Sequence, residues 1–238
     1  KVFIYSIGNF PTLRCLEHIR NSIAYHDLPV FIICMGGGYS YGSLGFSHHA
    51  TEDLSITNAI PNLSIYVPCS KSESYTAFKT AYRLNKPAYI RVDKSAAPDV
   101  KAVIKNHNFS LYFEGQSILV IGSGGLLEEA FVAREELLSE FNIGIASLHK
   151  IKPLNIKKIL ELLERYNLVI TLEENNVLGG INSLISRVIA EHRLNIDLKV
   201  IAISDRYNYV VGSQKYLRTV NKLDKNTIKK EIRKWANK

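Results

Sequence analysis

Short apolar runs rich in β-branched residues alternate with helical patterns along almost the whole 238-residue chain. Near-continuous apolar strands of this kind are typical of parallel sheets that helices cover on both faces. The alternation therefore predicts an α/β fold. The predicted strands are residues 2–5, 30–34, 64–67, 88–92, 118–122, 144–148, 168–172 and 198–203.

The segments between these strands carry helix-start signals and an apolar periodicity. Thr12 is expected to cap a helix that reaches about residue 26. Ser70, with Glu73 three positions later, forms a capping box for a helix that ends near residue 84. The other predicted helices are residues 126–141, 156–166, 180–192 and 226–235.

Residues 94–115 interrupt this rhythm with Ala96-Ala97-Pro98 and a mixed polar run. We expect two doubly wound, mostly parallel-sheet domains, with residues 1–94 as the first, 95–115 as the linker and 116–238 as the second. Only four strands fall in the first domain, and it opens inside an apolar run. The expectation is therefore a first domain that is truncated at its N-terminus.

The net charge of +8 is compatible with nucleic acid, an anionic membrane or phosphorylated substrates. Much of it lies in residues 222–238, which hold seven Lys or Arg against two Asp or Glu. Ile228, Ile232 and Trp235 form a helical apolar stripe there, which favours a docked terminal helix with a solvated basic face over a nucleic-acid surface. With no recognition motif and no apolar run of about 18 residues, we expect neither a nucleic-acid nor a membrane partner.

The chain has three cysteines and no CxxC motif. An odd number of cysteines in apolar stretches argues against a disulfide framework, so a reducing, cytoplasmic location is expected. His48 and His49 are adjacent and are not expected to converge on a metal ion.

A glycine-rich segment directly follows the predicted strand 30–34. Five glycines fall within residues 36–45, and His48 and His49 follow before Thr51-Glu52-Asp53 opens a helix. The loop beyond the carboxyl end of a parallel strand is where α/β proteins bind ligands, and imidazoles placed there can transfer protons near neutral pH. The alternative, a long surface loop whose histidines only form hydrogen bonds, stays open at this stage.

Two further glycine-containing segments are less specific. Residues 121–129 form a strand, a turn and a helix, but Glu128 and Glu129 in the first helical turn would repel a phosphate, which favours a structural turn. In residues 171–183 the adjacent carboxylates Glu173 and Glu174 follow a strand. An acid/base pair is one interpretation, and a structural turn or a domain interface is favoured because neighbouring side chains rarely converge on one atom.

Taken in order, the segments resemble the C-terminal half of a transketolase, and the likeness covers almost the whole chain. One group resembles the family's pyrimidine-binding domain and comprises residues 5–10, Arg14, 17–21, 47–54, 59–63 and 86–91. A second group resembles the C-terminal domain of transketolases and of 1-deoxyxylulose-5-phosphate synthases and comprises residues 118–124, 149–154 and 173–180. The form that the chain resembles most is the separately encoded C-terminal subunit of a split transketolase.

This resemblance implies a thiamine-diphosphate enzyme that moves a two-carbon ketol unit between sugar phosphates. The cofactor would lie between two chains, and the N-terminal, diphosphate-binding subunit would carry the Mg²⁺ ligands, so no metal ligand is expected here. The expected assembly is a homodimer or a heterotetramer, and the isolated chain is expected to be inactive.

The resemblance also implies roles for single residues on the cofactor side. Phe10 matches the aromatic residue that stacks on the aminopyrimidine ring, and Ile7 and Leu13 would pack around it. Arg14 is a candidate contact to the cofactor or to a phosphate, with a surface ion pair as the alternative.

On the substrate side, His48 matches the family histidine that reaches the substrate hydroxyl groups and assists proton movement. His49 is a candidate by adjacency. Lys94 falls where many members carry a cation near the sugar phosphate, and Arg91 lies one strand step away. Cationic donors at these positions suit a phosphorylated substrate.

Three departures from the family pattern leave alternatives open. No segment matches the one that bears the family's catalytic glutamate. Leu44 stands where transketolases carry an aspartate, and Gly36 stands where a histidine is expected. The alternatives are a non-catalytic scaffold or regulatory module of the same fold and a decarboxylating transferase like 1-deoxyxylulose-5-phosphate synthase.

Overall fold

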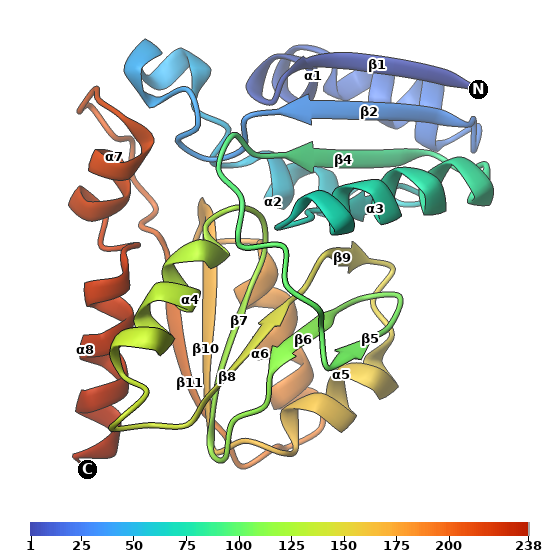
Figure 1. The fold of residues 1–238 in the computed structure, drawn as a ribbon. Coiled ribbons are helices and arrows are strands. Elements are labelled where there is room, and N and C mark those ends of the chain that lie inside the picture. The colour runs from blue at the N-terminus through green and yellow to red at the C-terminus, as the bar shows by residue number, and fades with distance from the viewer. Residues whose placement is uncertain (238) are drawn as a thin grey trace.

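The computed structural model describes residues 1–237, which form two stacked α/β layers (Figure 1). The first sheet has the order β1-β2-β4-β3-β9. Its first four members pair in parallel, and β9 pairs antiparallel with β3. The strands are β1 (Val2–Ile7), β2 (Val30–Met35), β3 (Ser64–Tyr66), β4 (Ala88–Val92) and β9 (Lys150–Lys152).

The helical segments of the first layer differ in regularity. Ser70 caps α3 as predicted, since its side chain accepts from the Glu73 N–H. Thr12 is not a cap: it lies inside α1, where its hydroxyl donates to the Gly8 carbonyl (2.8 Å). The segments are α1 (Asn9–Arg14), the π-helical η1 (His18–Ala24), the 3₁₀ turns η2 (Gly42–Leu44) and η3 (Phe46–His48), α2 (Asp53–Asn58) and α3 (Lys71–Leu84).

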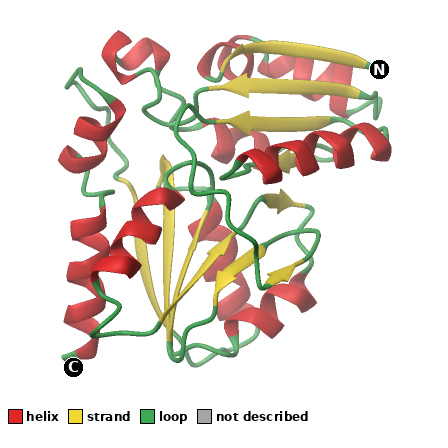
Figure 2. Ribbon diagram, viewed as in Figure 1, coloured by secondary structure: helices red, strands yellow, loops and turns green. Residues whose placement is uncertain are grey.

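The second sheet has the order β11-β10-β7-β8-β6-β5, with helices on both faces (Figure 2). Its strands are β5 (Ile104–Lys105), β6 (Ser110–Phe113), β7 (Ile118–Gly122), β8 (Ile143–Ser147), β10 (Leu168–Asn176) and β11 (Asp197–Ile203). Its helices are α4 (Leu127–Glu136), α5 (Ile156–Leu163), α6 (Ile181–Glu191), α7 (Gln214–Val220) and α8 (Lys225–Ala236).

The predicted α/β class with two mostly parallel sheets is confirmed. One hairpin and one helix lie where no element was predicted: β5 and β6 form an antiparallel hairpin inside the predicted linker, and α7 lies in a stretch with no predicted helix. A third, β9, belongs to the C-terminal half of the sequence but completes the first sheet. The two layers are therefore joined by shared strand pairing as well as by a linker.

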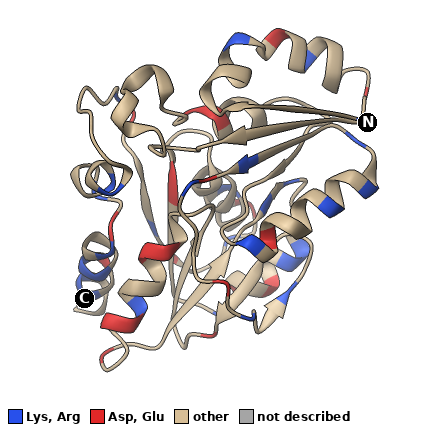
Figure 3. Ribbon diagram, turned by 45° about the horizontal axis from the view of Figure 1, so that its top comes forward, with Lys and Arg blue, Asp and Glu red and all other residues tan. Residues whose placement is uncertain are grey.

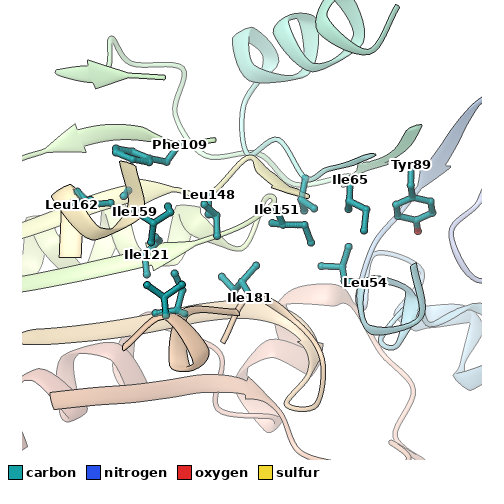
Figure 4. Packing of buried hydrophobic residues seen from close by; sticks show 14 of the residues in the cluster. Leu54, Ile65, Tyr89, Phe109, Ile121, Leu148, Ile151, Ile159, Leu162 and Ile181 are labelled. Atoms are coloured by element: carbon teal, nitrogen blue, oxygen red, sulfur yellow. The ribbon is translucent and has the colours of Figure 1, made fainter. Parts of the chain in front are cut away.

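A continuous apolar core crosses the boundary between the layers. Leu54, Ile65 and Tyr89 of the first layer belong to the same buried cluster as Ile121, Leu148, Ile151 and Ile181 from beyond the linker (Figure 4). Burial of this apolar surface holds the layers in one arrangement. Loops that meet at their boundary are consequently held by both.

The terminal helix α8 docks as its apolar stripe predicts. Ile228 and Ile232 are fully buried. Lys225 and Lys229 pair with Glu136 of α4, so part of the basic face is matched by acidic residues (Figure 3). Among residues 1–237, no helix has both the length and the apolar character needed to cross a bilayer.

Candidate functional site

The candidate site lies at the carboxyl ends of β1 and β2. There the Gly8 N–H donates to the Met35 carbonyl (2.9 Å), and the chain turns directly into α1. A Cβ at Gly8 would stand 3.0 Å from the Ala50 Cβ, so the close approach of this turn to the Gly-rich loop (residues 36–50) favours glycine. Asn9 then donates to the Ser47 carbonyl (2.5 Å) and ties α1 to that loop.

Three of the predicted site residues meet at this turn. The rings of Phe10 and His48 lie edge to face with centroids 5.2 Å apart. The Arg14 guanidinium lies over the Phe10 ring, 4.6 Å from its centroid. An aromatic face, an imidazole and a cation therefore form one small surface.

Phe10 is half-buried and belongs to none of the apolar core clusters among residues 1–237. Of its predicted neighbours, Ile7 is half-buried and Leu13 is exposed. A partly exposed phenyl ring is a suitable surface for a flat heteroaromatic ring. These side chains thus fit the pyrimidine end of thiamine diphosphate.

His48 is half-buried, and its Nδ1 lies 3.0 Å from the Ser47 hydroxyl. This contact engages Nδ1 and orients the imidazole.

His49 is 4% exposed and packs against the Tyr39 ring with centroids 5.0 Å apart. Burial lowers the pKa of His49, so its imidazole is neutral at pH 7. The imidazole of His49 is therefore buried within the Gly-rich loop, and the substrate contact predicted for it stays a prediction.

Arg91 is buried rather than open to solvent. Its side chain is 2% exposed and donates to Asp53 Oδ1 (3.1 Å), to Asp93 Oδ1 (3.4 Å) and to the Glu174 carbonyl (2.8 Å). A substrate phosphate would have to displace these partners. The structure therefore places Arg91 among the contacts between the two layers, and the substrate contact predicted for it stays a prediction.

Lys94 is exposed and lies at the same end of the first sheet. Its Nζ lies 3.6 Å from the centroid of the Tyr41 ring, which belongs to the Gly-rich loop. A cation–π contact of this kind places the charge over the loop while leaving it open to solvent.

The turn at residues 121–129 is structural, as predicted. Gly124 has a φ of +68°, and the Gly125 N–H donates to Asp93 Oδ2 (2.7 Å). Glu128 pairs with Arg218 (2.6 Å). The turn therefore binds neighbouring side chains of the protein.

Glu173 and Glu174 do not form an acid/base pair, because their carboxylates engage different partners. Glu173 accepts from the backbone N–H groups of Ile181 (2.8 Å) and Asn182 (2.9 Å) and so caps α6. Glu174 accepts from the Tyr39 N–H (2.9 Å) and pairs with Arg218 (2.8 Å). The domain-interface interpretation is confirmed for Glu174.

The Glu173 carboxyl predicts a pH dependence of stability. Burial raises its pKa to about 7, against hydrogen bonds from α6 that lower it. Between about pH 4.5 and pH 7 the folded protein holds this proton and the unfolded chain does not. As the pH rises through this range, the free energy of unfolding therefore falls by about 1.4 kcal/mol per pH unit. Urea unfolding of the wild type and of Glu173→Gln at pH 5, 6 and 7 checks this: we expect a smaller slope in the variant, and equal slopes would contradict it.

Sequence reasoning missed Arg218 and Gln214, which join α7 to the Gly-rich loop through Glu174 and Ser40. Their helix is only seven residues long and carries a weak pattern. Among residues 1–237, no group of three or more His, Cys, Asp or Glu side chains is arranged to hold a metal ion.

The fold is that of a transketolase-like protein. A solved structure described as a split-gene transketolase, inactive β4 tetramer, matches 98% of this chain and 74% of its own with a TM-score of 0.81 at 24% identity. The family model for the transketolase pyrimidine-binding domain matches residues 1–99, and that for the transketolase C-terminal domain matches residues 111–228. The chain belongs to the transketolase family.

Curated relatives cover the chain almost completely. One of the subunits of the apulose-4-phosphate transketolase of Phocaeicola vulgatus is 26% identical over 100% of this chain and 77% of its own length. A putative transketolase C-terminal section of Methanocaldococcus jannaschii is 28% identical over 97% of the chain and 74% of its own. The 1-deoxy-D-xylulose-5-phosphate synthase of Dechloromonas aromatica is 30% identical over 94% of the chain, which spans 36% of that enzyme.

Proposed function

We propose that this chain is the pyrimidine-binding subunit of a thiamine-diphosphate-dependent transferase that moves a two-carbon ketol unit between sugar phosphates. The observation that carries the proposal is the surface formed by Phe10, Arg14 and His48 at the carboxyl ends of β1 and β2. Relatives named as a single transketolase subunit and as a transketolase C-terminal section support a subunit of a two-chain enzyme.

Exposed apolar side chains beside the site support a covering partner. Leu44 and Phe46 of the Gly-rich loop are more than half exposed, and Phe46 packs edge to face on Tyr207 with ring centroids 4.9 Å apart. Exposed apolar groups gathered at the mouth of a site are typical of an interaction surface. The proposed partner is a diphosphate-binding subunit, which would also hold Mg²⁺.

Bound thiamine diphosphate would supply the carbanion that attacks a substrate carbonyl. The residues of this chain would bind and orient. Phe10 would stack on the aminopyrimidine between Ile7 and Leu13, and Arg14 would face the cofactor. His48 would exchange a proton with a substrate hydroxyl through Nε2, and Lys94 would bind the sugar phosphate.

Reconstitution tests this function. The chain is mixed with its diphosphate-binding partner, thiamine diphosphate and Mg²⁺, and ketol transfer between phosphorylated sugars is followed by a coupled assay. We expect activity from the mixture and none from either chain alone. A complex that binds thiamine diphosphate but transfers no ketol unit would instead favour the non-catalytic module.

The stacking role of Phe10 gives a binding prediction. In Phe10→Ala we expect the Kd for thiamine diphosphate in the assembled complex to rise about tenfold, because an aromatic pair contributes about 0.5–1.5 kcal/mol beyond its area burial. Titration calorimetry measures it. Phe113→Ala is a matched control, since Arg134 also lies over that half-buried ring (4.0 Å) but in the C-terminal layer. Equal affinities in Phe10→Ala and Phe113→Ala would contradict the stacking role.

A further inference from the structure

We propose that Glu174 and Arg218, both beyond the linker, are positioning residues. They hold the Gly-rich loop and the Lys94 segment (residues 93–97) in a fixed arrangement relative to each other. The proposal rests on the proposed function in one respect only, namely that His48 and Lys94 act on the same substrate. It assigns to the C-terminal layer a role in the geometry of a site that lies on the other layer.

Glu174 packs against the Gly-rich loop at residues 38 and 39. Its side chain is 1% exposed, and Oε1 accepts from the Tyr39 N–H (2.9 Å). Gly38 has a φ of +56°, and a Cβ there would stand 2.4 Å from the Glu174 Cγ, so the glutamate occupies the space that a side chain at 38 would need. Gly38 in turn exchanges two backbone hydrogen bonds with Ala50 (2.8 and 3.0 Å), and this pairing closes the loop just after His48.

Arg218 connects the same carboxylate to the second segment. Its Nε and Nη2 donate to Glu174 Oε2 (3.0 and 2.8 Å), and Nη2 also donates to Ser95 Oγ (2.7 Å). Ser95 follows Lys94 directly. The planar guanidinium therefore fixes the direction from one loop to the other as well as the distance.

Residues 40–42 of the Gly-rich loop contact α7. Gln214 Nε2 donates to Ser40 Oγ (3.1 Å) and to Glu174 Oε2 (3.1 Å). A Cβ at Gly42 would stand 2.4 Å from the Leu217 Cδ1, so α7 packs closely on the loop. Three contacts from the C-terminal layer thus converge on residues 38–42.

Stability alone does not account for this arrangement. Apolar residues of similar volume stabilise a buried interface as well as a buried ion pair does, and without desolvating two charges. The ion pair adds directional hydrogen bonds that fix how the two segments are oriented. These segments carry His48 and Lys94, the two side chains proposed to act on the substrate. Displacement of a catalytic group by about 1 Å can lower a rate about a hundredfold.

The first test needs no cofactor. Amide hydrogen exchange is measured by mass spectrometry on peptides spanning 36–50 and 93–97 in the wild type, E174Q and Q214A. E173Q is the matched control, because Glu173 is the adjacent buried carboxylate but caps α6. In E174Q we expect exchange in both peptides to rise about tenfold. In Q214A we expect this rise only in the 36–50 peptide, and in E173Q neither peptide should change.

Wild-type exchange in E174Q, or the same rise in E173Q, would overturn the proposal. If E174Q does not fold, R218K decides for both peptides, because lysine keeps the charge but lacks the planar guanidinium that joins Glu174 to Ser95.

The second test uses the reconstituted complex. We expect Q214A and E174Q to lower kcat/KM for a phosphorylated sugar about tenfold or more while the Kd for thiamine diphosphate stays within about twofold. Loss of cofactor affinity in parallel with activity would overturn the proposal, since it would indicate general loosening. If the wild-type complex transfers no ketol unit, the proposed function fails, and the hydrogen-exchange result still decides whether Glu174 and Arg218 position the two segments.

Discussion

Replacing His48 with alanine is expected to lower ketol transfer by the reconstituted complex by about 10²–10⁴-fold, the usual contribution of a positioned acid or base. The imidazole lies at the site surface with Nδ1 engaged by Ser47, so the substitution removes proton exchange at Nε2 without opening the core. Initial rates at saturating cofactor measure the effect. Unfolding and cofactor binding are expected to change little, because His48 is half-buried and belongs to no core cluster among residues 1–237.

Two comparisons sharpen this prediction. His18→Ala removes an exposed imidazole from the π-helical segment and is expected to retain activity. His48→Gln keeps a hydrogen-bonding side chain but cannot exchange a proton near pH 7, so it should resemble His48→Ala in kcat. Full activity in His48→Ala would show that another group moves the proton.

Replacing Arg91 with alanine is expected to lower the free energy of unfolding by about 3–5 kcal/mol, the usual effect of removing one partner from a buried ion pair. The substitution would leave the Asp53 carboxylate buried with the Tyr89 hydroxyl (2.6 Å) and without its cation, and it would remove the donor to the Glu174 carbonyl. Denaturant unfolding measures this loss, which is a large part of the stability of a typical domain.

Arg14→Ala is the matched control, since Arg14 is exposed and its guanidinium lies over the Phe10 ring at the site surface. Its stability is expected to stay within about 0.5 kcal/mol of the wild type. Wild-type stability in Arg91→Ala together with a raised KM for a phosphorylated sugar would restore the substrate contact that the sequence predicts for Arg91.

Most of the parallel strands could be predicted to within one or two residues at each end, although β10 runs four residues beyond its predicted end. Predicted strands 88–92 and 118–122 coincide with β4 and β7. They are buried on both faces and bounded by turns, so local pattern and tertiary burial agree. Strands β5 and β9 are two and three residues long and form only because a neighbouring edge accepts them, which leaves no local signal.

The residues of the candidate site also differ in how far the sequence could predict their placement. The resemblance placed Phe10 and His48 in one site, and the fold brings their rings together. His49 and Arg91 have the residue types expected of substrate contacts, yet both are buried. Residue type and position along the chain do not report whether a side chain turns inward, as His49 does, or whether buried carboxylates such as Asp53 and Asp93 pair with it, as they do with Arg91.

By itself, the sequence determined the α/β class, the order of the main elements, the capped start of α3 and the docking of α8, because these depend on periodicity and on neighbours a few residues apart. The tertiary structure alone decided that the C-terminal layer completes the first sheet through β9 and reaches the Gly-rich loop through Glu174 and Arg218. Those two residues lie 44 positions apart, and Glu174 lies 135 positions from the Tyr39 amide from which it accepts. Contacts of that range form only when packing of the apolar core has brought the layers together, so no local pattern encodes them.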